Sequence, residues 1–205
     1  GDVVAMNATG SFPAMNICMY AALETLGAEP AIVSSVAASE YGATNPELTW
    51  PDMEHLLFDQ DITSFRSAAA SLGGILDVGR GHSEEGREML RASVERNDLP
   101  LLSPEDFEDA VRLRMRTYEA VADGREIAVF INVGGGTASV GTHDDKRDFR
   151  PGLNTRVPVG LERTSVMRTF LERGTPVIHV SQIRSLARRY GLADMPEVTP
   201  EVGEG

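Results

Sequence analysis

The chain has 205 residues, of which 41% are hydrophobic and 24% are charged. This length supports one domain with a substantial core, and the composition excludes wholesale disorder and collagen-like repeats. The net charge is -12, and residues 1–79 hold ten carboxylates against one cation. This acidity argues against nucleic-acid binding, which needs a basic surface. Cys18 is the only cysteine, so neither an intrachain disulfide nor a cysteine-based zinc site can form.

The first part of the chain predicts a βαβ unit followed by a helix and a third strand. Residues 3–6 form an apolar run typical of a buried strand, and apolar residues recur at helical spacing from Met15 until Gly27 ends the helix. Residues 31–33 predict the second strand. Thr49-Trp50-Pro51-Asp52 has the form of a helix start, and the stretch 65–72, rich in alanine, predicts the third strand.

The middle of the chain predicts two helices and two strands. One helix begins at Ser83 and runs to about Asn97, and residues 99–102 form a short strand. Ser103-Pro104-Glu105-Asp106 predicts an N-cap serine with proline in the first helical position, and this helix runs to Gly124. Residues 127–131 are the most apolar strand, so we expect them at the centre of the sheet.

The last part of the chain predicts a long excursion over residues 142–160, which serves as a lid, a partner contact or a mobile loop. A helix from Glu162 to Gly174 and a strand over 176–180 follow, and Ser181 caps a final helix. Residues 193–205 form a tail or linker. The alternation of strands and helices predicts a single α/β domain over residues 1–192, a three-layer Rossmann-like sandwich with a mostly parallel sheet of about six strands. Its ligand crevice lies at the carboxyl ends of the strands.

Four loops with small, polar residues leave those strand ends: 9–11, the segment from 34 onward, 73–83 and 132–141. In the first loop, Thr9, Gly10 and Ser11 are candidate ligand-binding residues. Ser11 is the expected N-cap of the first helix, which leaves backbone N–H groups facing the crevice. The alternative is a cap without a ligand.

The last of these loops carries three consecutive glycines that can bring backbone N–H groups close to an anion. Its candidate ligand-binding residues are Asn132, Gly134, Gly135, Gly136 and Thr137. The loop matches neither a Walker motif nor a dinucleotide fingerprint, so we expect no nucleotide cofactor. The alternative is that the glycines only allow a tight turn.

Nucleophilic catalysis has partial support. Ser11 and Ser139 are candidate nucleophiles, although neither sits in a complete Gly-x-Ser-x-Gly motif. His82, in the loop before a capped helix, is the best candidate base, and His179 lies near a strand end. His55 is assigned to packing or to the surface.

Charged loops offer two further candidate sites. Arg80, close to His82, is a candidate clamp for a carboxylate or phosphate, or else a surface residue that pairs with Glu84 or Glu85. Asp144, Asp145 and Asp148 could hold a hard cation, but an exposed acidic loop is the commoner explanation. Because no paired-histidine spacing occurs either, we expect no metal site.

Five segments together carry a family resemblance. They are residues 8–16 (ATGSFPAMN), 49–54 (TWPDME), 67–74 (SAAASLGG), 80–87 (RGHSEEGR) and 131–136 (INVGGG). As a set they resemble the poly-gamma-glutamate system protein family, and the resemblance covers roughly residues 2–190.

The resemblance implies an accessory role in bacterial poly-gamma-glutamate (capsule) biosynthesis or export, with the polymer or a glutamyl ligand and other proteins of that system as partners. It also implies an extracytoplasmic domain that is anchored in the membrane. No apolar stretch here reaches the roughly 20 residues that span a bilayer, so the anchor is expected in segments outside this chain. The alternative function is a hydrolase or transferase that acts on gamma-glutamyl bonds through a serine nucleophile.

Overall fold

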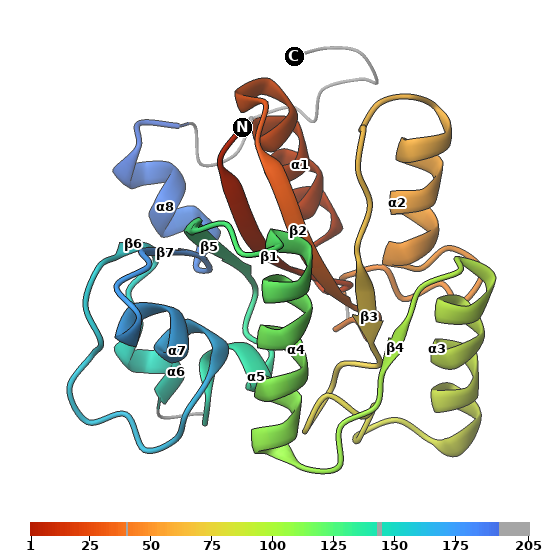
Figure 1. The fold of residues 1–205 in the computed structure, drawn as a ribbon. Coiled ribbons are helices and arrows are strands. Elements are labelled where there is room, and N and C mark those ends of the chain that lie inside the picture. The colour runs from red at the N-terminus through yellow and green to blue at the C-terminus, as the bar shows by residue number, and fades with distance from the viewer. Residues whose placement is uncertain (40, 143–144, 193–205) are drawn as a thin grey trace.

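A mixed, largely parallel sheet forms the middle layer of the computed structural model, which describes residues 1–39, 41–142 and 145–192 (Figure 1). The strands of this part of the chain are β1 (Val3–Thr9), β2 (Glu29–Ser35), β3 (Ala69–Ser71), β4 (Leu101–Leu102), β5 (Ile127–Val133), β6 (Gly152–Asn154) and β7 (Val177–Val180). They are arranged in the order β4-β3-β2-β1-β5-β7-β6. Only β6 runs antiparallel to its neighbour, β7. The predicted three-layer Rossmann-like sandwich is therefore confirmed, with seven strands rather than about six.

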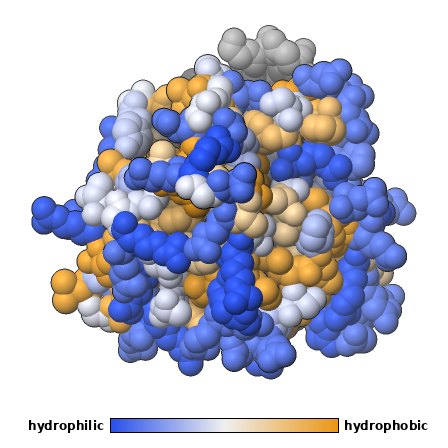
Figure 2. Space-filling view, viewed as in Figure 1, coloured by the Kyte–Doolittle hydropathy of each residue, from blue (hydrophilic) through white to orange (hydrophobic). Residues whose placement is uncertain are grey.

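Helices cover both faces of the sheet. The described helices are α1 (Pro13–Leu26), α2 (Trp50–Asp59), α3 (Glu84–Arg96), α4 (Phe107–Ala122), α5 (Thr137–Val140), α6 (Asp145–Asp148), α7 (Val166–Glu172) and α8 (Ile183–Arg189). Helices α4 and α7 pack on one face against Ala5 and Phe130, whereas α1, α2 and α8 pack on the other against Met6 and Ile32. Successive strand residues point to opposite faces of the sheet. The apolar residues of the strands therefore contribute to two separate cores, one on each face. In the space-filling view, hydrophilic residues form most of the visible surface (Figure 2).

The central strand is β1 and not β5, which corrects the sequence-based expectation. All seven residues of β1 are buried, whereas β5 begins with partly and fully exposed residues and lies between β1 and β7. Apolar composition indicates that both faces of a strand are covered. It does not indicate how many strands lie on either side, and for this reason β5 was misplaced by one position.

Two helix starts also differ from the prediction. Helix α4 is capped by Asp106, whose side chain accepts a hydrogen bond from the Asp109 N–H at 2.8 Å. Ser103 and Pro104 therefore precede the helix. Helix α8 follows Gln182, which adopts a left-handed conformation, and Ser181 does not cap it. By contrast, Ser83 caps α3 as expected, accepting a hydrogen bond from the Gly86 N–H at 3.1 Å.

The excursion over residues 142–160 contains α6 and the edge strand β6, although the sequence predicted no regular element there. Asp145 is buried, and its carboxylate accepts hydrogen bonds from the backbone N–H groups of Thr142 at 2.8 Å and Glu162 at 2.7 Å. It therefore ties the two ends of the excursion together. Asp144 and the tail over 193–205 lie outside the described residues. Within the described ranges, no helix combines the length and apolarity needed to cross a bilayer.

Candidate functional site

The order of the strands places a crevice between the ends of β1 and β5. From β1 the chain continues to β2 on one side, whereas β5 pairs with β1 on the other side, in parallel. Ligands of open α/β sheets bind at such a switch point, outside the carboxyl ends of the strands. The expectation that the loops after β1 and β5 leave neighbouring strands is confirmed.

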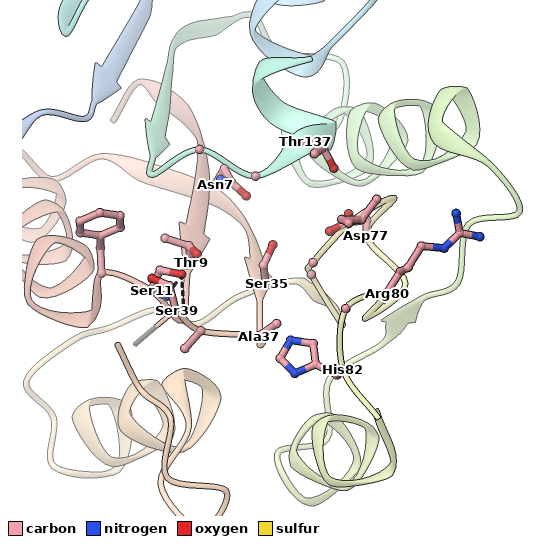
Figure 3. A pocket seen from close by; sticks show the side chains of 18 residues that line it. Asn7, Thr9, Ser11, Ser35, Ala37, Ser39, Asp77, Arg80, His82 and Thr137 are labelled. Atoms are coloured by element: carbon pink, nitrogen blue, oxygen red, sulfur yellow. Dashed lines mark hydrogen bonds between the residues drawn. The ribbon is translucent and has the colours of Figure 1, made fainter. Parts of the chain in front are cut away.

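A cavity of about 580 Å³ lies at this position, and residues from all four predicted loops line it (Figure 3). Its lining includes Asn7, Thr9, Ser11 and Phe12 from β1 and its loop, Ser35, Ala37, Ala38 and Ser39 after β2, Gly73, Gly74, Ile75, Asp77, Arg80, Gly81 and His82 after β3, and Gly135, Gly136 and Thr137 after β5. This volume is in the range of small-molecule sites.

The floor of the cavity is a buried polar network centred on Arg114 of α4. Its guanidinium donates to Asn7 Oδ1 at 2.7 Å, to Ser35 Oγ at 2.8 Å and to Ser71 Oγ at 2.7 Å. These three acceptors stand at the carboxyl ends of β1, β2 and β3, on the sheet face that α4 covers. Arg114 therefore joins three strands directly under the cavity.

Asp77 balances the charge of Arg114. The two carboxylate oxygens accept hydrogen bonds from Arg114 Nε at 2.7 Å and from a terminal nitrogen at 3.0 Å, and both side chains are almost fully buried. Burial by itself lowers the pKa of the Arg114 guanidinium, but the Asp77 carboxylate more than offsets this effect, so that the pKa is raised. The pair fixes the loop that carries Arg80 and His82 to the cavity.

Asn132 of β5 extends the network under the neighbouring loop. Its side-chain oxygen accepts a hydrogen bond from Asn7 Nδ2 at 2.9 Å, and its Nδ2 donates to the Gly134 carbonyl at 2.9 Å and lies 3.0 Å from His179 Nδ1. Gly134 has φ +85°, and a Cβ there would come within 2.9 Å of the Thr9 side chain. Asn132 supports the triple-glycine turn, Gly134–Gly136, from below, and neither Asn132 nor Gly134 is part of the cavity lining.

The triple-glycine turn carries the unused hydrogen-bonding groups of the site. Among the described residues, the backbone N–H groups of Gly135, Gly136 and Thr137 have no acceptor. The hydroxyl oxygen of Thr137 is buried and also lacks a partner. Buried polar groups in proteins are almost always hydrogen-bonded, so the unpartnered Thr137 hydroxyl is the unusual group here. Gly135 is half-buried and Gly136 is exposed, so their N–H groups are open to water or to a ligand's oxygen atoms.

Ser11 does not cap α1, which corrects the prediction. The N-cap is Phe12 without a side-chain hydrogen bond, and the Ser11 hydroxyl instead accepts a hydrogen bond from the Ser39 N–H at 3.0 Å. Ser11 thereby joins the loops after β1 and β2 at the cavity wall (Figure 3). Gly10 does not line the cavity. It is needed because a Cβ there would lie 2.3 Å from the Val36 carbonyl oxygen.

The catalytic candidates are only partly brought together. Ser11 and His82 line the same cavity but stand apart in Figure 3, and no hydrogen bond joins them. Ser139 is buried in α5 and His179 is buried in β7, both away from the lining.

Arg80 contributes less to the cavity than the sequence indicated. Its side chain is exposed and extends outward from the other labelled residues (Figure 3). It does not form the expected surface pair, because Glu84 pairs with Arg87 and Arg91 instead.

The sequence-based prediction missed the buried floor. Arg114 occupies a position within the apolar stripe of α4, three residues after Val111 and four before Tyr118, both buried. A lone arginine at such a position is a signal for a buried ion pair, because an unpaired buried charge is too costly to be retained. Its partner Asp77 could not be identified from sequence, since it comes from a loop 37 residues earlier.

Comparison with protein-family models, with curated proteins and with solved structures finds no match to this chain. The function is therefore argued from the cavity and from the sequence resemblance.

Proposed function

We propose that this chain is an accessory protein of bacterial poly-gamma-glutamate synthesis or export that binds a carboxylate of a glutamyl ligand in the cavity after β1 and β5. The observation that carries the proposal is the triple-glycine turn, where three backbone N–H groups and the buried Thr137 hydroxyl lack partners. Together they are four hydrogen-bond donors at the wall of one cavity. A carboxylate, which accepts through two oxygens, matches this set.

The choice of a glutamyl ligand comes from the sequence resemblance. Four of the five segments that carry it supply residues to the cavity lining, including Ser11, Gly73, His82 and Gly136. The fifth segment, residues 49–54, forms the start of α2. A resemblance concentrated around one cavity favours a role for that cavity in the function of the family.

The strong negative charge of the chain is compatible with an anionic ligand. Backbone N–H groups carry partial positive charge without adding a cation, and the Arg114–Asp77 pair leaves the floor close to neutral. Arg80 is the arginine of the lining and has no carboxylate partner among the described residues, although its side chain extends outward. The cavity can accept one carboxylate while the acidic surface repels the rest of a polyanion, so we expect recognition of one or a few glutamyl units.

The proposal extends to partners and location. Other proteins of the polymer system are the expected binding partners, and the extracytoplasmic face of the membrane is the expected location, with anchoring segments outside this chain. Both follow from the resemblance alone.

A second candidate function is hydrolysis or transfer of gamma-glutamyl bonds. One observation favours it, namely that Ser11 and His82 line the same cavity. However, the Ser11 hydroxyl is engaged by the Ser39 N–H, and no histidine contacts it within the described residues. A nucleophile and its base need to come within about 2.6–3.2 Å, so binding without turnover is the better-supported function.

Calorimetric titration with a gamma-linked glutamate tetramer tests the proposal, with the alpha-linked tetramer as control. We expect the gamma-linked tetramer to bind and to remain intact by mass spectrometry. Thr137→Val, which removes the hydroxyl but keeps the shape, should weaken binding about tenfold, whereas Thr137→Ser should retain it. Equal affinity of Thr137→Val and Thr137→Ser for the gamma-linked tetramer would contradict the proposal, as would a failure of the tetramer to bind. Cleavage of the tetramer would favour the second candidate.

A further inference from the structure

A second, apolar hollow of about 200 Å³ lies beside the polar cavity. Its walls come from the segment after β2, from the start of α2 and from α3, and they include Val36, Ala43, Pro46, Met89 and Leu90. Val36 and Ala43 are buried, and Met89 is 43% exposed at the mouth. An engineered apolar cavity of roughly 150 Å³ holds a benzene molecule, so this hollow has room for an apolar group of four to six carbon atoms.

The hollow lies next to the polar cavity. Ala38 and His82 line both spaces, so a ligand that extends past these two side chains can reach from one space into the other. The His82 ring is half-buried, and among the described residues neither of its nitrogens has a hydrogen-bond partner. An imidazole at the junction can donate to or accept from an amide.

We infer that the site takes a two-part ligand, with a carboxylate at the triple-glycine turn and a short apolar group in the hollow between α2 and α3, joined by an amide beside His82. The chemical class is a gamma-glutamyl amide of an apolar amine or amino acid. This inference rests on the proposed function for its glutamyl end only. The apolar subsite and the short apolar group that we place in it are supported by the geometry of the hollow itself.

Two dipeptide probes, gamma-glutamyl-leucine and gamma-glutamyl-glycine, test this inference. Because the leucyl side chain leaves water on binding, we expect the leucine probe to bind about tenfold more tightly than the glycine probe. Met89→Trp fills the mouth of the hollow and should abolish that preference. Glu88→Trp, an exposed position on the same helix that lines neither space, should keep it.

Equal binding of the two dipeptides, or a preference that survives Met89→Trp, would overturn the apolar subsite and leave the proposed function intact. If neither dipeptide binds, the two-part ligand is wrong, whereas the tetramer titration decides the proposed function. The apolar subsite is then tested with a separate probe. In that titration, 3-methylbutan-1-ol should shift the methyl NMR signals of Met89 and Leu90. Unchanged signals would rule the subsite out.

Discussion

The substitution Arg114→Met tests whether the buried network supports the floor of the cavity. It removes the guanidinium donors that reach Asn7, Ser35 and Ser71, and it leaves the Asp77 carboxylate buried with the Ser71 hydroxyl as its remaining side-chain donor. Breaking a buried ion pair from one side typically costs about 3–5 kcal/mol, because the remaining charge is uncompensated. We expect a loss of this size in the free energy of unfolding.

The same helix supplies the control. Arg112 pairs with Asp109, but its side chain is 53% exposed, so Arg112→Met should cost at most about 1 kcal/mol. Urea denaturation followed by circular dichroism gives both values. Combining Arg114→Met with Asp77→Asn removes both charges, so the double variant should lose at least about 2 kcal/mol less than the sum of the single losses. Strict additivity, or an Arg114→Met loss as small as that of Arg112→Met, would refute the role of the network.

Three further predictions concern backbone strain and pH. Gly134→Ala should destabilise the fold by about 1–3 kcal/mol in urea denaturation, because the residue is left-handed and its Cβ would meet Thr9; a loss below about 0.5 kcal/mol would contradict this. Burial raises the pKa of the Glu54 carboxyl despite the hydrogen bonds it accepts. The protonated carboxyl therefore contributes fully to stability at pH values below the ordinary pKa of glutamate, and this contribution is lost as the pH rises through the raised pKa. Glu54→Gln should flatten that part of the stability profile, and an unchanged slope would argue against it. Burial alone would raise the pKa of Asp52, but hydrogen bonds led by Arg96 lower it to about 2. Asp52→Asn should therefore cost about 1–2 kcal/mol at neutral pH and progressively less below pH 4; a constant cost would contradict the shift.

Local patterns in the sequence predicted the layers of the fold, because each depends on short-range periodicity. The helix stop at Gly27, with φ +60°, and the cap at Ser83 are both local features and both are confirmed. The edge strand β6 was missed because it has three residues and is defined by pairing with β7. The cap of α4 was misplaced because Ser103 and Asp106 are both good capping residues, and only the path of the chain selects between them.

The candidate site was predicted in position but not in composition. The loops after β1 and β5 could be inferred from strand ends, and the rule for switch points brought them together. Asn7 and Ser35 were not singled out, because their importance depends on Arg114 from a distant helix. Ser11 was assigned a local role as a cap, whereas its hydroxyl contacts Ser39 across the cavity wall.

The most direct measurement compares the affinity of the gamma-linked glutamate tetramer for Gly136→Pro and Gly136→Ala. Gly136 has φ -60° and ψ 140°, which suit proline, and a Cβ there meets nothing within 4 Å. The preceding Gly135 has no Cβ to clash with the proline ring. Both variants should therefore fold, but only proline removes an N–H donor from the turn. We expect Gly136→Ala to bind as the unchanged protein does and Gly136→Pro to bind about tenfold or more weakly. Equal affinity of the two variants would contradict ligand binding by the backbone N–H groups of this turn.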